Sequence, residues 1–332
     1  MPPFDLRRAA IGDRVEHEFL IRDRAEKVTR AGLPFVVLML ANRSGTIETA
    51  PIWSEKLEWA AGAEKGKVVQ AIGEIGVFGE EGARKRQLQL SAPLRVLRRD
   101  EFDPSEFLPT VETDLERLWD GIDKLRTGIG AATIRRAVDL FFADDAFRVM
   151  FERSPASING HHAQMGGLLL HVLEVTSIAR HIARTVRRAN VDLVVAGALL
   201  HDVGKVDAYA IGPEGFSYTS SGLLVGHVTL GAIMFDRRCL ESRIDLSIAQ
   251  RDELLHFILS HHGANERAGP VPPMTTEAEI VHWADEASAK ATDMMDEFAE
   301  PELFPFEGAT GLSAKRSWRL GRRLWRRPAP WD

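Results

Sequence analysis

The sequence predicts a multidomain α+β protein in which a small five-stranded β-barrel is followed by an all-α domain. Short β-type segments separated by turn residues fill residues 12–97, whereas apolar residues recur at helical spacing from residue 111 onwards. The chain has 332 residues, of which 45% are hydrophobic and 27% are charged. This length and composition suit two domains of a globular protein.

Five β-type segments make up the N-terminal part, and a helical insert near residues 54–62 separates the third segment from the fourth. Turn residues such as Asn42-Arg43-Ser44-Gly45 lie between the segments. Five strands with one helical insert are the outline of an OB-fold barrel. The predicted strands are residues 13–22, 34–41, 45–53, 67–78 and 85–97.

This N-terminal part resembles the OB module of nucleic-acid-binding proteins in the order of PFVVLMLANRSGTIETAPIW and GEIGVFGEEGARKRQLQL. Such barrels hold single strands by stacking bases on aromatic side chains beside a basic groove. An aromatic residue of a small barrel more often belongs to the core, so we place the expectation on the cluster near residues 78–86. The residues expected to contact a strand are Phe78, Arg84, Lys85 and Arg86, with Phe35 and Trp53 as further candidates.

An acidic segment that contains proline, residues 100–110, follows the barrel and is expected to be a linker. Amphipathic helices are predicted near residues 111–127 and 131–143, where they would buttress the helices that follow.

A His-Asp pair, His201-Asp202, ends an apolar helical run and is followed by Gly204, a residue type that often ends helices. On a buried face an imidazole and a carboxylate are costly unless something binds them, and a divalent cation does so. An isolated pair would serve equally well as a helix cap. Further His and Asp residues, however, lie on four other apolar helical runs, which favours a metal site in the core of a helical bundle. They are His171, His227, His261, His262 and Asp285.

The ordered motifs resemble those of the HD-domain metal-dependent phosphohydrolases, and most of all the YhaM-type 3′→5′ exoribonucleases, which join an OB module to an HD-domain helical bundle. The resemblance covers about residues 12–298. No Gly-Tyr-Pro follows the HD region, which argues against the cyclic-di-GMP phosphodiesterase branch. The motifs are HHAQMGGLLLHV, ALLHDVGK, LLVGHVTLGA, LSHHG and PMTTEAEIVHWAD.

The resemblance implies two divalent cations bridged by Asp202. Two such ions activate a water and stabilise charge on a phosphoryl oxygen. Nitrogen and oxygen ligands without a thiolate favour Mn²⁺, with Co²⁺, Fe²⁺ and Mg²⁺ as alternatives. The implied partition sets His171, His201 and Asp285 on one ion and His227, His261 and His262 on the other.

Three more residues near these motifs are expected to contact substrate. Lys205 is placed to reach a phosphate oxygen and is predicted to be catalytic together with Asp202, although a solvated lysine at a helix end is an equal alternative. His161 and His162 match the family pattern outside the ligand set, and they would touch the substrate or cap the next helix.

The domain divisions that follow from these motifs are an OB-fold nucleic-acid-binding domain, a linker with buttressing helices, an HD domain and a basic tail rich in Trp and Arg. The charge is unevenly distributed along the chain. The net charge is −6, but the tail is basic and the middle of the chain is acidic. A cation-binding core with polyanion-binding flanks fits this distribution. The divisions are residues 1–99, 100–153, 154–300 and 301–332.

The basic tail interleaves seven Lys and Arg residues of residues 313–332 with Trp318, Trp325 and Trp331. Such a mixture suits a phosphate backbone and stacked bases. A helix that docks its tryptophans on the HD domain with its arginines in solvent is at least as well supported.

The single cysteine, Cys239, excludes an internal disulfide framework and is expected to be a small buried hydrophobe in a reducing cytoplasm. The first residues lack the apolar region of a signal peptide, and no apolar run reaches transmembrane length. We therefore expect a cytoplasmic protein without a membrane partner, as a monomer or a homo-oligomer.

The function expected from these patterns is a metal-dependent 3′→5′ exoribonuclease acting on single-stranded RNA, with single-stranded DNA as a further substrate. One alternative is a small-nucleotide phosphohydrolase or cyclic-nucleotide phosphodiesterase, which would not need a strand-holding barrel. The other is a non-catalytic RNA-binding adaptor, which would not need a complete set of metal ligands.

Overall fold

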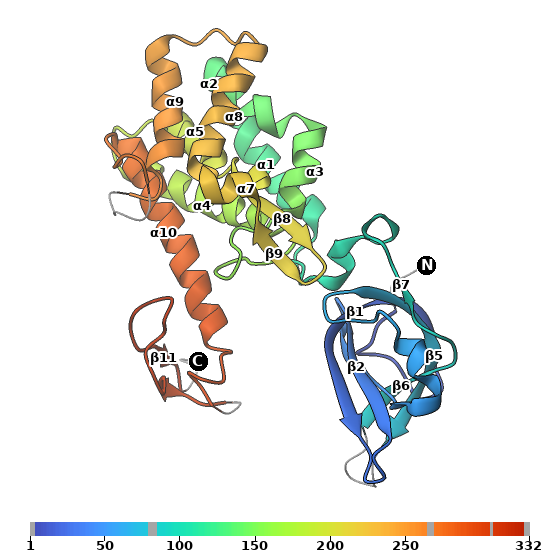
Figure 1. Cartoon of the computed structure of the whole chain (residues 1–332). Helices are drawn as coiled ribbons and strands as arrows, with labels where there is room; N and C mark the ends of the chain where they lie inside the picture. Colours follow the sequence, from blue (N-terminus) through green and yellow to red (C-terminus); the bar gives the residue numbers. More distant parts are fainter. Residues whose placement is uncertain (1–3, 79–84, 264–268, 306–307, 329–332) are drawn as a thin grey trace. The chain divides into compact units, whose positions relative to one another are not determined.

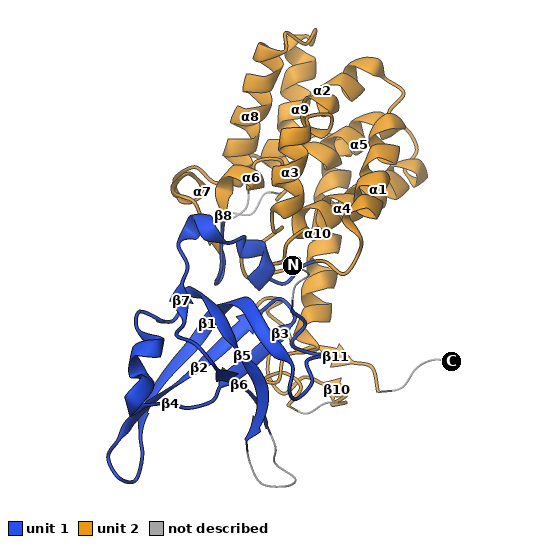
Figure 2. Ribbon diagram, turned by 90° about the vertical axis from the view of Figure 1, so that its right-hand side faces the viewer, with its two compact units in different colours: residues 1–110, 211–215 blue, residues 111–210, 216–332 orange. Residues whose placement is uncertain are grey.

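The computed structural model of the chain has two compact units, shown in different colours in Figure 2. A closed five-stranded barrel in the first unit and a helical region in the second confirm the predicted fold class. The first unit is residues 1–110 with 211–215, and the second is residues 111–210 with 216–332. The structure describes residues 4–78, 85–263, 269–305 and 308–328.

The barrel closes because β1 pairs with both β2 and β5, while β3 and β6 join the two ends of the sheet in parallel. The long β1 serves both neighbours by bending at a bulge between Ile21 and Asp23. The barrel strands are β1 (Arg14–Val28), β2 (Pro34–Asn42), β3 (Gly45–Thr49), β5 (Val68–Phe78) and β6 (Lys85–Leu90).

Two of the predicted strands are each divided in the structure. Residues 45–53 give β3 and the short β4 (Ile52–Trp53), and residues 85–97 give β6 and the short β7 (Arg95–Val96). Pro51 and Pro93 lie at the two breaks, where a residue without an N–H cannot continue a ladder. The predicted helical insert is the 3-10 helix η1 (Ser54–Ala60).

Alternating residues of these strands fill the barrel, as the two-residue period of a strand requires. Phe19, Leu38, Val69, Ala71 and Leu88 are fully buried in this core. The segment after the barrel forms two short 3-10 helices, η2 (Arg99–Glu101) and η3 (Pro104–Phe107).

The second unit is helical, and Figure 1 shows α4, α5, α8, α9 and α10 packed side by side in it. Within the described residues no helix is long and apolar enough to cross a membrane. A hairpin of β8 (Tyr209–Gly212) and β9 (Gly215–Tyr218) follows α6, and its residues 211–215 belong to the first unit. The helices are α1 (Leu115–Thr127), α2 (Ala132–Phe142), α3 (Asp145–Arg153), α4 (Gly167–Thr185), α5 (Val191–Leu200), α6 (Lys205–Ala208), α7 (Ser220–Leu224), α8 (His227–Glu241), α9 (Ile248–Ser260) and α10 (Thr276–Glu297).

The central helix of this unit is α5, which contacts α1, α2, α4, α9 and α10. Its residues from Val194 to Leu200 are all buried, as expected for a helix that is apolar on every side. Asn190 caps its first turn by accepting from the N–H groups of Asp192 and Leu193. The end of α5 therefore delivers His201-Asp202 into the interior.

The apolar run predicted as one helix around His227 is two helices in the structure. Gly226 has φ +78° and ψ 150°, which is outside the helical region, and it separates α7 from α8. The run was predicted to begin at Leu223 and Leu224, which are 71% and 85% exposed in the structure. The break leaves His227 at the first position of α8.

The chain after α10 folds as a small module, residues 301–305 and 308–328, which we call the C-terminal module. Leu303, Phe304, Ala309 and Leu324 form its core, and β10 (Gly311–Leu312) pairs with β11 (Trp325–Arg326). The docked-helix alternative is wrong for the described residues of the tail, because no helix forms there. Trp318 and Trp325 are exposed, and Trp331 lies outside the described residues.

Candidate functional site

The seven predicted metal ligands come from five helices of the second unit, and the structure brings all seven together. His171 lies on α4 and Asp285 on α10, both on buried faces. The other five stand at helix ends, which places their side chains in the space between α5, α8 and α9. His201 and Asp202 follow α5, His227 begins α8, and His261 and His262 follow α9.

Close backbone packing brings the His201-Asp202 turn up to α8. The expectation that Gly204 ends a helix is wrong, because its φ is −74° and the chain continues into α6. A Cβ at Gly204 would lie 2.1 Å from the carbonyl oxygen of His227 and 2.3 Å from the nitrogen of Gly231. Position 204 therefore requires glycine because the backbone of α8 approaches it closely. Gly263, in contrast, has φ +75° and ends the turn after α9.

Asp202 lies at the centre of the cluster, with its two carboxylate oxygens facing different histidines. Its Oδ2 is 3.5 Å from Nε2 of His171 and 3.2 Å from Nε2 of His201. Its Oδ1 is 3.5 Å from Nε2 of His227 and 3.6 Å from Nε2 of His261. A carboxylate so placed is able to bridge two cations.

Asp285 and His262 complete the cluster and contact each other. Oδ1 of Asp285 is 3.1 Å from Nε2 of His171, and its Oδ2 is 3.4 Å from Nδ1 of His262. Nε2 of His262 is 3.0 Å from Nε2 of His227. The donor atoms form two groups, each with all members within 4.8 Å of one another. The groups are His171, His201 and Asp202, and His227, His261 and His262.

The chemistry of these donors fits divalent cations. Oδ1 of Asp202 and Nε2 of His261 are buried and have no hydrogen-bond partner among the described residues, which is costly without a ligand. Burial lowers the pKa of His227 to about 3, so its imidazole is in the neutral form that binds metals. Burial opposes ionisation of Asp202, but the Lys205 ammonium and the nearby imidazoles outweigh it and hold the pKa of Asp202 well below its usual range.

Backbone carbonyls fix the orientation of two of the histidines. Nδ1 of His201 is 2.6 Å from the carbonyl oxygen of Ala198, and Nδ1 of His261 is 2.8 Å from that of Ile258. A proton held on Nδ1 leaves the Nε2 lone pair free for a cation.

A series of hydrogen-bonded side chains fixes the orientation of His171. The sequence analysis did not predict these side chains. Nδ1 of His171 is 3.3 Å from the hydroxyl of Ser288, which donates to Oε2 of Glu174 at 2.8 Å. Nε2 of His162 lies 3.0 Å from the same Glu174 oxygen. Glu174 and Ser288 each follow a predicted ligand by three residues, His171 and Asp285, and that spacing is the signal that would have found them.

Lys205 is buried, with its Nζ 2.5 Å from Oδ2 of Asp202. Burial lowers the pKa of its ammonium, but the Asp202 carboxylate outweighs this effect and the pKa is raised overall. The alternative of a solvated lysine at a helix end is therefore wrong.

The barrel carries a groove of about 480 Å³ on its surface. The rings of Phe35 and Trp53 lie 5.1 Å apart in it, and Trp53 and Phe78 are 43% and 65% exposed. Two cations, Lys27 and Lys85, stand beside these rings. The groove thus combines aromatic and basic side chains as a single-strand site does. The complete lining is Lys27, Phe35, Val37, Glu48, Pro51, Trp53, Phe78, Lys85 and Gln87.

One described residue that was predicted to bind a strand, Arg86, does not line the groove. Arg86 donates a hydrogen bond of 2.6 Å to the carbonyl oxygen of Ala9. Arg84 lies outside the described residues.

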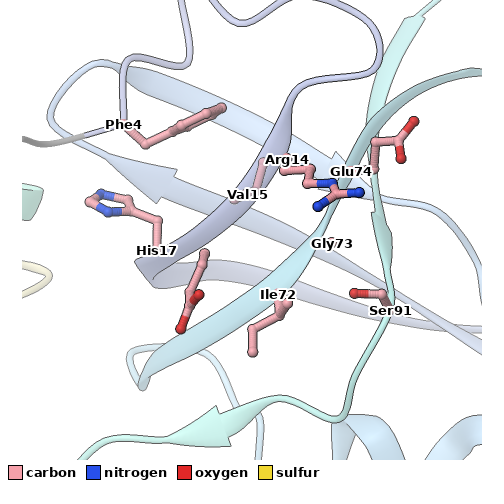
Figure 3. Close-up of a pocket in the computed structure, with 9 residues that line it drawn as sticks. Phe4, Arg14, Val15, His17, Ile72, Gly73, Glu74 and Ser91 are labelled. Carbon is pink, nitrogen blue, oxygen red and sulfur yellow. The ribbon is translucent and has the colours of Figure 1, made fainter. Parts of the chain in front are cut away.

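A second hollow of about 720 Å³ lies along β1 and β5, and Figure 3 shows the residues that line it. Its lining mixes the charges of Arg14 and Glu74 with the apolar side chains of Phe4 and Ile72. Burial lowers the pKa of His17 there. Among the described residues, those predicted to bind a strand do not line this hollow.

Residues 168–290 match the family model described as HD domain, a span that contains all seven clustered side chains. The helical unit therefore carries an HD domain over residues 168–290. The chain is 31% identical to the 3′-5′ exoribonuclease YhaM of Bacillus subtilis over 87% of this chain and 89% of the relative. It is 30% identical to that of Listeria welshimeri over 86% and 88%. The chain belongs to the YhaM 3′-5′ exoribonuclease family.

Among solved structures, the chain is similar to a domain of replication protein A from Methanococcus maripaludis. The sequence identity is 11% over 29% of this chain and 94% of that chain, and the TM-score is 0.23. A similarity of this size carries no conclusion about function.

Proposed function

We propose that this protein is a metal-dependent 3′→5′ exoribonuclease that hydrolyses the phosphodiester bonds of single-stranded RNA. The observation that carries the proposal is the placement of Asp202, whose two oxygens face two separate groups of histidines. Relatives that match nearly the whole chain are named 3′-5′ exoribonucleases, which supports the same reaction. A cytoplasmic site of action fits Cys239, a buried free thiol.

The proposed ligand sets follow the two faces of Asp202. Two bound cations would supply a water of lowered pKa and positive charge beside the phosphoryl oxygen. Nitrogen and oxygen donors without a thiolate favour Mn²⁺, and Co²⁺, Fe²⁺ and Mg²⁺ are the alternatives. His171, His201 and Asp285 would hold one ion, and His227, His261 and His262 the other, with Asp202 shared.

The groove of the barrel is the proposed grip on the substrate strand. Phe35, Trp53 and Phe78 offer ring faces to bases, and Lys27 and Lys85 offer charge to phosphates. Single-stranded DNA would use the same surface, since stacking on a base does not require a 2′-hydroxyl. A hydrolase of small nucleotides would have no use for this groove.

Lys205 supplies a fixed positive charge against Asp202. Its replacement by Ala should lower kcat on RNA. The activation free energy should rise by roughly one to a few kcal/mol, as for the loss of one electrostatic stabiliser. Metal content, measured by mass spectrometry, should not change. Lys290→Ala is the matched control, because Lys290 pairs with Glu286 on the exposed side of α10. An unchanged kcat in Lys205→Ala would remove Lys205 from the mechanism.

Metal removal tests the proposal as a whole. Protein stripped with a chelator should lose RNA hydrolysis and recover it on addition of Mn²⁺, with mononucleotides as the product. Chromatography of the products measures both effects. Full activity in protein shown to be free of metal would contradict the proposal.

A further inference from the structure

Three side chains connect the C-terminal module to the metal centre within the helical unit. Arg319 lies in a turn of the module, and its Nη1 is 3.5 Å from Oδ1 of Asp293 on α10. The other oxygen of Asp293, Oδ2, is 4.0 Å from Nδ1 of His161. The ring of His161 lies 5.1 Å from the ring of His171, measured between centroids. Arg319 and Asp293 belong to none of the sites described above.

All three side chains are largely buried, with exposed fractions of 20% for Arg319, 17% for Asp293 and 18% for His161. A carboxylate in such surroundings is costly unless a cation pairs with it. Burial raises the pKa of Asp293, and the guanidinium of Arg319 opposes that rise. Arg319 therefore favours an ionised carboxylate beside His161.

The loop that carries His161 is anchored by hydrogen bonds. The hydroxyl of Ser157 donates to the carbonyl oxygen of His161 at 2.9 Å, and the N–H of Gly160 donates to that hydroxyl at 2.8 Å. Oδ2 of Asp293 lies 4.0 Å from Nδ1, beyond hydrogen-bond distance, and its negative charge favours the tautomer with the proton on Nδ1 and a lone pair on Nε2. Nε2 of His161 is buried and has no hydrogen-bond partner among the described residues. His161 thus has an unused acceptor next to a predicted metal ligand.

We propose that Arg319 and Asp293 are positioning residues that hold His161 at the metal centre, where its Nε2 accepts a hydrogen bond from a ribose hydroxyl of the 3′-terminal nucleotide. This inference rests on the proposed exoribonuclease function and names a substrate contact for it. An acceptor requires a donor, and hydroxyl groups are the donors that the sugar-phosphate backbone of RNA carries. The C-terminal module then takes part in catalysis and is not a separate RNA tether.

The test uses RNA oligonucleotides that end in a ribonucleotide, a 2′-deoxynucleotide or a 3′-deoxynucleotide, and measures kcat and KM for removal of the last nucleotide. The wild-type protein should lose about tenfold in kcat/KM on one of the two deoxy-terminated substrates, as for one lost hydrogen bond. The substrate that shows the loss identifies the hydroxyl. His161→Ala, Asp293→Asn and Arg319→Ala should lose a similar factor on the all-ribose substrate and should no longer distinguish the substrates.

Arg319→Lys keeps a cation beside Asp293 and should still distinguish them. Arg322→Ala is the matched control, because it removes an exposed arginine of the same module, and it should behave as the wild type does. The double variant of His161→Ala with Asp293→Asn should be no slower than His161→Ala alone, since Asp293 acts through His161.

The inference would be overturned if Asp293→Asn still distinguished the ribose-terminated from the deoxy-terminated RNA as the wild type does. It would also be overturned if the losses in kcat/KM added up in the double variant. Asp293→Asn keeps the shape of the side chain, so it decides the question even if Arg319→Ala does not fold. A wild-type protein that degrades RNA without sensing either hydroxyl overturns this inference alone. A wild-type protein that is inert on RNA overturns the proposed function.

Discussion

Replacing Asp202 by Asn is expected to abolish hydrolysis of RNA. The change keeps the shape of the side chain but removes the charge that both groups of histidines face, at oxygen-to-nitrogen distances of 3.2 to 3.6 Å. A bridging carboxylate serves both cations, so metal content should fall together with the rate. Loss of several kcal/mol of transition-state stabilisation corresponds to a decrease of about 10³-fold or more in kcat.

The matched control is Asp207→Asn, which changes an exposed carboxylate on α6, five residues further along the chain. It should keep both rate and metal. Single-turnover kinetics and metal analysis on the same preparations give the comparison, with thermal unfolding to establish that both variants are folded. Turnover of RNA by Asp202→Asn at close to the wild-type rate would rule out a shared carboxylate.

Removing the two exposed aromatic side chains of the barrel groove is expected to have the next largest effect. Stacking of one base on one ring contributes about 1–3 kcal/mol, so Trp53→Ala combined with Phe78→Ala should reduce kcat/KM on long single-stranded RNA by about 30-fold or more. Hydrolysis of a small activated phosphodiester should not change, because such a substrate has no further bases to stack on these rings. Steady-state kinetics on the two substrates measures the difference.

Ile72→Ala is the matched control for the barrel, since it removes an exposed apolar side chain from the other hollow. It should leave both reactions as they are. If the double variant degrades long RNA as well as this control does, the groove is not the grip on the substrate, and a hydrolase of small nucleotides becomes the better account.

Local patterns were sufficient to predict the barrel strands and the cluster of His and Asp side chains that we propose as metal ligands. Residues such as His171 and Asp285 lie on apolar stripes, where a polar side chain needs a partner, and that anomaly is visible in sequence. Glu174 and Ser288 follow two of these residues by one helical turn, a spacing that is visible in sequence, but their hydrogen bond joins α4 to α10 and is visible only in the structure. The ring pair of Phe35 and Trp53 is not visible in sequence, because the two residues belong to different strands.

Other features depended on packing between distant parts of the chain. Gly204 and Gly226 look alike in sequence, yet the first allows α8 to approach and only the second interrupts a helix. The C-terminal module exists because Leu324 packs on Leu303 and Phe304, contacts that no periodic pattern encodes. A charge-rich tail with three tryptophans therefore gave no indication of a fold.

The most direct test of the central claim is the pattern of products from a 5′-end-labelled single-stranded RNA incubated with the Mn²⁺-loaded wild-type protein. We expect a ladder of labelled products that shorten one nucleotide at a time from the 3′ end, with the label released last. The ladder should be absent without metal and absent with Asp202→Asn. Internal fragments at early times, or immediate release of the labelled nucleotide, would contradict a 3′→5′ exoribonuclease.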